Sequence, residues 1–170
     1  AKDHDVVKAR ALCEGLQAGE IVIGDRAYVG FGYLAELTAR GVYWVMRVKK
    51  SLRLRVVRRR PASSDRSIVR DEEVVLVKPG TRQKYPMRFR RVTAWVEVDG
   101  QPKLMEFMTN NLEWSPRSVA ELYRCRWDIE VFFKELKQTV QLTDFLGHNA
   151  AAVKWQVWMG LLVHLLLRYQ

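Results

Sequence analysis

The stretch that most restricts the possible folds of this chain is residues 20–48, where two short apolar runs flank a helical segment. The first run, EIVIG, begins after Gly19 and ends at Gly24, and its length and β-branched residues are typical of a buried strand. The second run, VYWVMRV, follows Gly41, which we expect to cap the end of the helical segment. A strand, a helix and a strand in this order predict a parallel pair joined by a right-handed crossover. An α/β fold is therefore expected.

Residues 49–111 have a different pattern, with four runs that are typical of strands: LRLRVVRRR, EEVVLV, RFRRVTAWVEV and KLMEFMTN. Turn-forming sequences separate these runs, and Asp99–Gly100 is a strong signal for a β-hairpin. We therefore expect residues 49–111 to form an antiparallel β insertion.

Helical patterns occupy both ends of the chain. The first is DHDVVKARALCEGL, whose apolar residues have helical spacing and which we expect to end at Gly19. Near the other end, Ser115 as N-cap and Pro116 at the first helical position predict a long helix to about residue 142. A second long helix should follow, in the sequence AAAVKWQVWMGLLVHLLLRY that begins at residue 150.

The last of these helices is apolar enough to raise the question of a membrane span. However, Lys154, Gln156 and His164 interrupt it, and the uninterrupted apolar run is shorter than the ~18 residues that a span needs. We therefore interpret it as a core helix and expect no membrane association.

Basic residues are concentrated in one part of the chain. The net charge is +10, yet residues 47–91 hold 16 of the 29 lysines and arginines and only four acidic residues. Such an excess favours a polyanionic partner, and nucleic acid is the first candidate. Within this segment the run Arg58, Arg59 and Arg60 is the strongest candidate for contacts with phosphates. The alternative is an ordinary solvated ribbon of surface arginines.

The sequence YRCRWDIEVFFKELK places four polar side chains on one face of the long helix. At 100° per residue, Tyr123, Arg126, Glu130 and Lys137 fall within a stripe about 60° wide, at the border of the apolar face. A carboxylate between an arginine and a lysine could bind a metal ion and a phosphate together. A plain surface pair between Glu130 and a lysine is an equally good interpretation of the spacing alone.

A second carboxylate lies directly after the first predicted strand, in the sequence VIGDRAY. Ligand-binding and catalytic groups collect at the carboxyl ends of strands in open α/β sheets, so Asp25 is a candidate metal ligand. Carboxylate oxygens suit hard cations such as Mg²⁺. Asp25 could also cap the helix that follows, and the two roles are compatible.

These two segments together resemble the DDE transposases of the IS-four type. The spacing Tyr123-x2-Arg126-x3-Glu130-x6-Lys137 matches the signature helix of that family, and IVIGDRAYVG is similar to the strand that carries its second aspartate. The sequence YWVMRVKK resembles the strand that follows. The resemblance extends along nearly all of the chain and is weakest in residues 51–111.

The resemblance implies Mg²⁺- or Mn²⁺-dependent hydrolysis and strand transfer at the transposon ends of double-stranded DNA, with a two-metal site. Asp25 and Glu130 would be the second and third acids and would bind the metals. Tyr123, Arg126 and Lys137 would hold DNA phosphates near the cleavage site. It also implies an enzyme of the bacterial cytoplasm that joins the nucleoid when it binds DNA.

The implied fold is an RNase H-like core formed by residues 1–48 and 112–170, interrupted by the basic β insertion at residues 49–111. One departure matters, because the family's first aspartate lies on a strand well upstream of the second, and no such strand precedes Asp25 here. We therefore expect a C-terminal part of the catalytic domain, with an incomplete metal site and no activity on its own.

Two expectations complete the prediction. If the first strand of the core is absent, the strand at residues 20–24 has an open edge, which favours a homodimer. The alternative function is a non-catalytic, basic nucleic-acid-binding module, which metal binding by Asp25 and Glu130 would distinguish from a transposase.

Overall fold

The computed structural model describes residues 2–48, 51–98, 100–140 and 149–168. The chain divides into two compact units, Ala1–Arg126 and Trp127–Gln170. The elements in chain order are α1 (Lys2–Leu12), β1 (Ile21–Gly24), the 3₁₀ turn η1 (Arg26–Tyr28), α2 (Phe31–Ala39), β2 (Tyr43–Arg47), β3 (Leu54–Arg59), β4 (Ile68–Leu76), α3 (Pro79–Lys84), β5 (Phe89–Val98), β6 (Gln101–Thr109), α4 (Pro116–Val140) and α5 (Ala150–Arg168).

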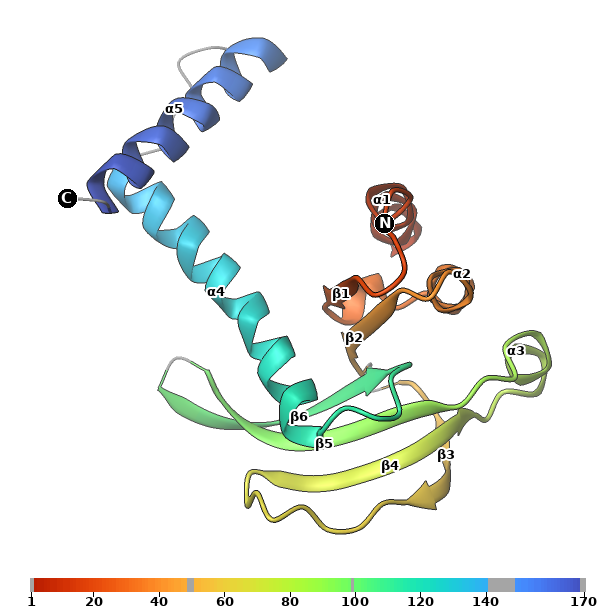
Figure 1. Ribbon diagram of the computed structural model, residues 1–170. Coiled ribbons are helices and arrows are strands. Elements are labelled where there is room, and N and C mark those ends of the chain that lie inside the picture. Colours follow the sequence, from red (N-terminus) through yellow and green to blue (C-terminus); the bar gives the residue numbers. More distant parts are fainter. Residues whose placement is uncertain (1, 49–50, 99, 141–148, 169–170) are drawn as a thin grey trace. The chain divides into compact units, whose positions relative to one another are not determined.

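All six described strands belong to one sheet, with the order β1-β2-β6-β5-β4-β3 (Figure 1). β1 and β2 are parallel, which confirms the strand–helix–strand prediction, and the other neighbours are antiparallel. The predicted hairpin is also present, because Val98 pairs with Gln101 and Gly100 adopts a φ of +70° that favours glycine. The mixed α/β class is therefore confirmed.

The pairing of β2 with β6 joins the N-terminal part of the chain to residues 49–111. Val45 pairs with Thr109, and Arg47 pairs with Phe107. Just past β6, the Asn110 amide donates to the Thr38 hydroxyl at 3.1 Å, and its oxygen accepts from the backbone N–H of Trp44 at 3.0 Å. The sheet is thus continuous across the boundary that we place at residues 48 and 49.

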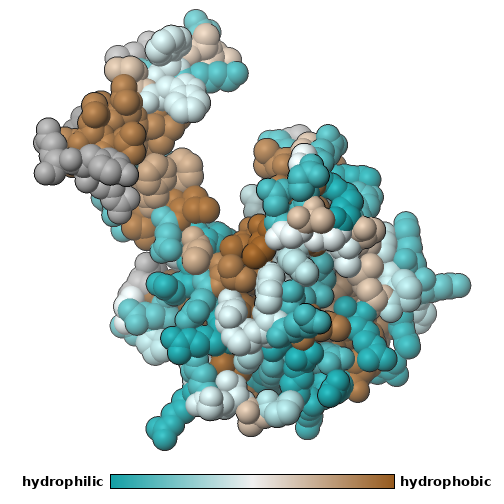
Figure 2. Space-filling model, viewed as in Figure 1, coloured by the Kyte–Doolittle hydropathy of each residue, from teal (hydrophilic) through white to brown (hydrophobic). Residues whose placement is uncertain are grey.

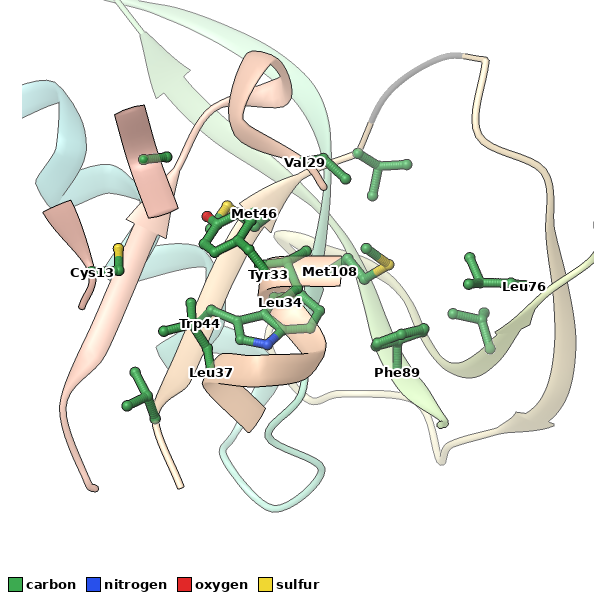
Figure 3. Close-up of a cluster of buried hydrophobic side chains, with 14 residues drawn as sticks. Cys13, Val29, Tyr33, Leu34, Leu37, Trp44, Met46, Leu76, Phe89 and Met108 are labelled. Atoms are coloured by element: carbon green, nitrogen blue, oxygen red, sulfur yellow. The ribbon is translucent and has the colours of Figure 1, made fainter. Parts of the chain in front are cut away.

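The core of the first unit lies between α2 and one face of the sheet (Figure 3). α2 contributes Tyr33, Leu34 and Leu37, and the sheet contributes Trp44, Met46, Phe89 and Met108. The rings of Trp44 and Phe89 lie 5.6 Å apart, and the Trp44 indole N–H donates to Thr38. This packing fixes the β1–α2–β2 unit, and with it the turn that follows β1.

The first helix is shorter than the sequence predicts. α1 ends at Leu12, and the Leu12 side chain is 83% exposed although its spacing placed it on the apolar face. The Arg40 guanidinium explains the early end, because it donates to the carbonyls of Cys13, Glu14 and Leu16. A side chain from another element thereby satisfies three carbonyl groups of the turn that follows α1 and favours that turn over a longer helix.

The prediction of a core helix at the C-terminus is wrong for the described residues. Of the 18-residue stretch Ala150–Leu167, 6% is buried, and Trp155, Trp158 and Leu166 are all more than half exposed. Figure 2 shows this hydrophobic surface. Among the described residues of its unit, α5 has the second half of α4 as its neighbour, with the rings of Phe132 and His164 5.1 Å apart. One neighbouring helix cannot cover a helix that is apolar on most sides.

By length and composition this same helix could cross a membrane, with a mean hydropathy of 1.4 over Ala150–Leu167. A single helix of this kind is weak evidence of a span, because core helices of soluble proteins meet the same criterion.

Candidate active site

Asp25 lies where β1 ends, at the edge of the sheet that the sequence predicted. Its carboxylate oxygen Oδ1 accepts the backbone N–H of Arg26 at 2.6 Å, so Asp25 caps the short η1 turn. The residue before it, Gly24, is buried against β2, where an added Cβ would lie 2.6 Å from the Met46 sulfur. Glycine at this position therefore allows the carboxyl end of β1 to lie directly against β2.

Tyr123 on α4 reaches the same carboxylate. Its hydroxyl donates to Oδ1 of Asp25 at 3.3 Å, although 98 positions separate the two residues. The Tyr123 side chain is fully buried, and its ring packs on Phe107 of β6 with 4.7 Å between centroids. The structure thus brings together one residue from each of the two segments that carried the resemblance.

Two arginines lie around this contact. The Arg126 guanidinium lies 5.3 Å from the centre of the Tyr123 ring. Burial and the neighbouring Asp25 carboxylate raise the pKa of Tyr123, while the charges of Arg126 and Arg47 act in the opposite direction. Because the net shift is upward, the phenol keeps its proton at neutral pH and can donate to Asp25.

Arg47 is a site residue that the sequence patterns did not predict. It is the last residue of β2, so it lies at the same end of the parallel pair as Asp25. The available signal was its position: a cation at the carboxyl end of the strand next to the one that precedes Asp25.

Glu130 and Lys137 lie on the part of α4 that belongs to the second unit. Both side chains are exposed, and they line one hollow of about 510 Å³ together with Phe133, Lys134 and Gln138. Tyr123, Glu130 and Lys137 are spaced seven positions apart along α4, so the three lie on one face of this helix. That the Glu130 carboxylate lies close to the Asp25 carboxylate stays a prediction.

The arginine run Arg58, Arg59 and Arg60 lies at the end of β3 and beyond, against two buried glutamates. Arg58 and Arg60 lie 3.6 and 3.3 Å from Glu73, and Arg59 lies 3.6 Å from Glu72. Arg88 also approaches Glu73, and Arg91 approaches Glu72. Five guanidinium groups therefore share two carboxylates, and the cluster keeps a positive charge. Arg58 and Arg59 are mostly exposed.

The described residues do not form a complete metal centre. Across residues 2–48, 51–98, 100–140 and 149–168 no group of three or more His, Cys, Asp or Glu side chains could hold a metal ion. Asp25 has the oxygen ligands that Mg²⁺ prefers, but a single carboxylate holds such an ion weakly. A metal at Asp25 would thus need further ligands.

Comparison with known proteins shows the family to which this chain belongs. The model of a family described as the transposase DDE domain matches residues 1–166, and the chain belongs to this family. The resemblance inferred from the signature residues is thereby confirmed.

Individual relatives agree with this assignment. The chain is 30% identical over 156 residues to "Putative transposase y4zB" of Sinorhizobium fredii, which covers 90% of this chain and 43% of that protein. It is 26% identical over 179 residues to the transposase InsG for insertion sequence element IS4 of Escherichia coli, covering 99% of this chain and 39% of the relative. The chain therefore spans about two fifths of the length of these relatives.

Proposed function

We propose that this chain is part of a DNA transposase of the DDE type, which cuts and joins phosphodiester bonds at transposon ends. The family match over residues 1–166 supports the proposal, and the contact between Tyr123 and Asp25 is the structural observation that carries it. The RNase H-like core and the domain boundaries given above belong to the same proposal.

We assign the following roles to the residues of the site. Asp25 and Glu130 bind Mg²⁺ or Mn²⁺, which in two-metal sites stabilises the attacking and leaving oxygens of a phosphodiester. Arg126 and Lys137 hold phosphates of the DNA. Tyr123 has no exposed surface, and its hydroxyl is bonded to Asp25, so we propose that it acts by orienting that carboxylate.

The metal assignment predicts that Asp25 and Glu130 converge, with their carboxylates about 4–8 Å apart, to suit two ions spaced ~3.5–4 Å. Mn²⁺ added to the labelled protein should then broaden the NMR signals of residues 24–26 and 129–131 together. Glu130→Gln should reduce the broadening at residues 24–26, whereas Asp128→Asn, an exposed acid on the same helix, should leave it unchanged. Independent responses of the two segments would refute the shared metal site and favour the non-catalytic alternative.

With only two of three acids the site should position metal ions poorly, and we propose that the chain alone does not cleave DNA. Robust Mg²⁺-dependent cleavage that Glu130→Gln abolishes would contradict this, and would show that another acid of this chain completes the site. We further propose that the substrate is double-stranded DNA and that the protein acts in the bacterial cytoplasm and on the nucleoid, without a membrane partner.

The open edge of β1 predicts self-association. Among the described strands β1 has a single neighbour, β2, and an unpaired edge exposes N–H and C=O groups that can pair with another chain. We therefore propose a homodimer through or near residues 20–24. Ile21→Lys should convert a dimer at micromolar concentration into a monomer in light scattering, because a charged edge residue opposes pairing.

A matched control for this experiment is Leu12→Lys, which adds the same charge at a residue that is 83% exposed on α1. A wild-type monomer whose amides at residues 21–23 are protected from exchange would overturn the homodimer and indicate cover from within the chain.

A further inference from the structure

A groove on the basic part of the sheet lies beside the Arg58–Arg60 run and includes none of its three arginines. It has a volume of about 890 Å³, and its lining includes Arg55, Arg82 and Arg88 together with Val57, Val75 and Val77. We call it the β3–α3 groove. Arg55 and Val75 are direct partners in the β3–β4 ladder, and α3 supplies Arg82. A strand pair and a short helix thus form a cationic concavity with an apolar floor.

The charge of this groove is not neutralised by its surroundings. None of the described residues that line it is acidic, and Arg55 and Arg82 have no ion pair with any described side chain. Arg88 lies 3.7 Å from Glu73, but that glutamate already has two other arginines within 3.6 Å. The groove therefore presents guanidinium groups that can bind an anion without first losing a partner.

The apolar floor of the groove sets a second requirement for the ligand, in addition to negative charge. Val57 and Val77 are 41% and 45% exposed, whereas Val75 is 7% exposed. A free phosphate ion would use only the arginines. A DNA strand presents both phosphates and the apolar faces of its deoxyriboses, so it matches the arginines and the valines at once.

We propose that the β3–α3 groove seats the sugar–phosphate backbone of one DNA strand, with phosphates on Arg55 and Arg82 and deoxyribose against Val57 and Val77. This inference rests on the proposed function, because it names a surface by which a transposase would hold its DNA. Such contacts position the DNA and carry no base specificity.

The test compares two double variants on a 30-base-pair duplex at several salt concentrations. Arg55→Gln with Arg82→Gln should make the slope of log affinity against log salt less steep by about 1.8, from about 0.9 per lost phosphate contact, and should weaken binding roughly 10- to 30-fold at 0.15 M salt. Lys8→Gln with Lys103→Gln removes the same charge outside residues 47–91 and should change affinity less than about 2-fold, because distant charges are screened. Arg88 is left in place because it also pairs with Glu73.

Methyl NMR signals give an independent readout. The methyl signals of Val57 and Val77 should shift on addition of the duplex and should not shift with inorganic phosphate at the same phosphate concentration. If the wild-type protein binds the duplex, two results would overturn the groove proposal. One is an equal loss of affinity for the duplex in the two double variants. The other is a shift of the valine methyl signals with inorganic phosphate alone. A wild-type protein that does not bind the duplex at all would overturn the proposed function as well.

Discussion

Replacing Arg90 by methionine should destabilise the sheet-bearing unit by about 3–5 kcal/mol, the usual cost of breaking a buried ion pair from one side. Arg90 is 1% exposed and donates two hydrogen bonds to Asp71, from Nε to Oδ1 at 2.7 Å and from Nη2 to Oδ2 at 2.6 Å. Its remaining nitrogen donates to the carbonyl of Trp114. Without Arg90, the 7% exposed Asp71 side chain would remain buried without its charged partner.

The measurement is urea denaturation followed by the circular dichroism of the sheet. Arg58→Met is the matched control, because Arg58 is 68% exposed and its partner Glu73 retains Arg60 and Arg88; it should cost less than about 1 kcal/mol. Asp71→Leu combined with Arg90→Met should recover a large part of the loss, since no charge is then left buried. Equal losses for Arg58→Met and Arg90→Met would contradict the assignment.

The Arg90–Asp71 pair also shows that pairing between strands could not be predicted from the sequence. Arg90 lies in a run that the sequence predicts as a strand, whereas Asp71 directly precedes such a run, and the two residues are 19 positions apart. Any of the 16 basic residues in residues 47–91 could have paired with Asp71. In the register between β4 and β5, Asp71 lies opposite Val92 and Arg90 lies opposite Glu73, so the buried ion pair runs diagonally across the two strands. The strands were predictable because alternation and turn residues are local signals, whereas their register depends on the whole sheet.

The same distinction between local signals and long-range packing applies to the residues of the candidate site. Asp25 was predictable, because a carboxylate after a short apolar run is a local pattern, and Tyr123 followed from helical spacing. Their contact needed the structure, because it depends on how α4 packs against Phe107. The early end of α1 also depends on a distant side chain, Arg40, so no local pattern could indicate it.

Changing Arg58, Arg59 and Arg60 together to glutamine should weaken DNA binding roughly 100-fold at 0.15 M salt and make the salt slope less steep by about 2 to 3 units. The reason is the excess of positive charge in this cluster, where five guanidinium groups share the carboxylates of Glu72 and Glu73. Arg59 is 83% exposed and Arg60 is 24% exposed, so most of the change should come from Arg58 and Arg59.

The fold should survive this triple change, which makes the binding measurement interpretable. Glu73 keeps Arg88 at 3.7 Å, and Glu72 keeps Arg91 at 2.5 Å, so neither buried carboxylate loses its last partner. Urea denaturation checks this directly. The control variant changes Lys8, Lys103 and Lys154 to glutamine, which removes an equal charge from exposed positions outside residues 47–91. A slope that stays at the wild-type value in the arginine variant would mean that this run is only a solvated ribbon, and that DNA binding depends on other surfaces such as the β3–α3 groove.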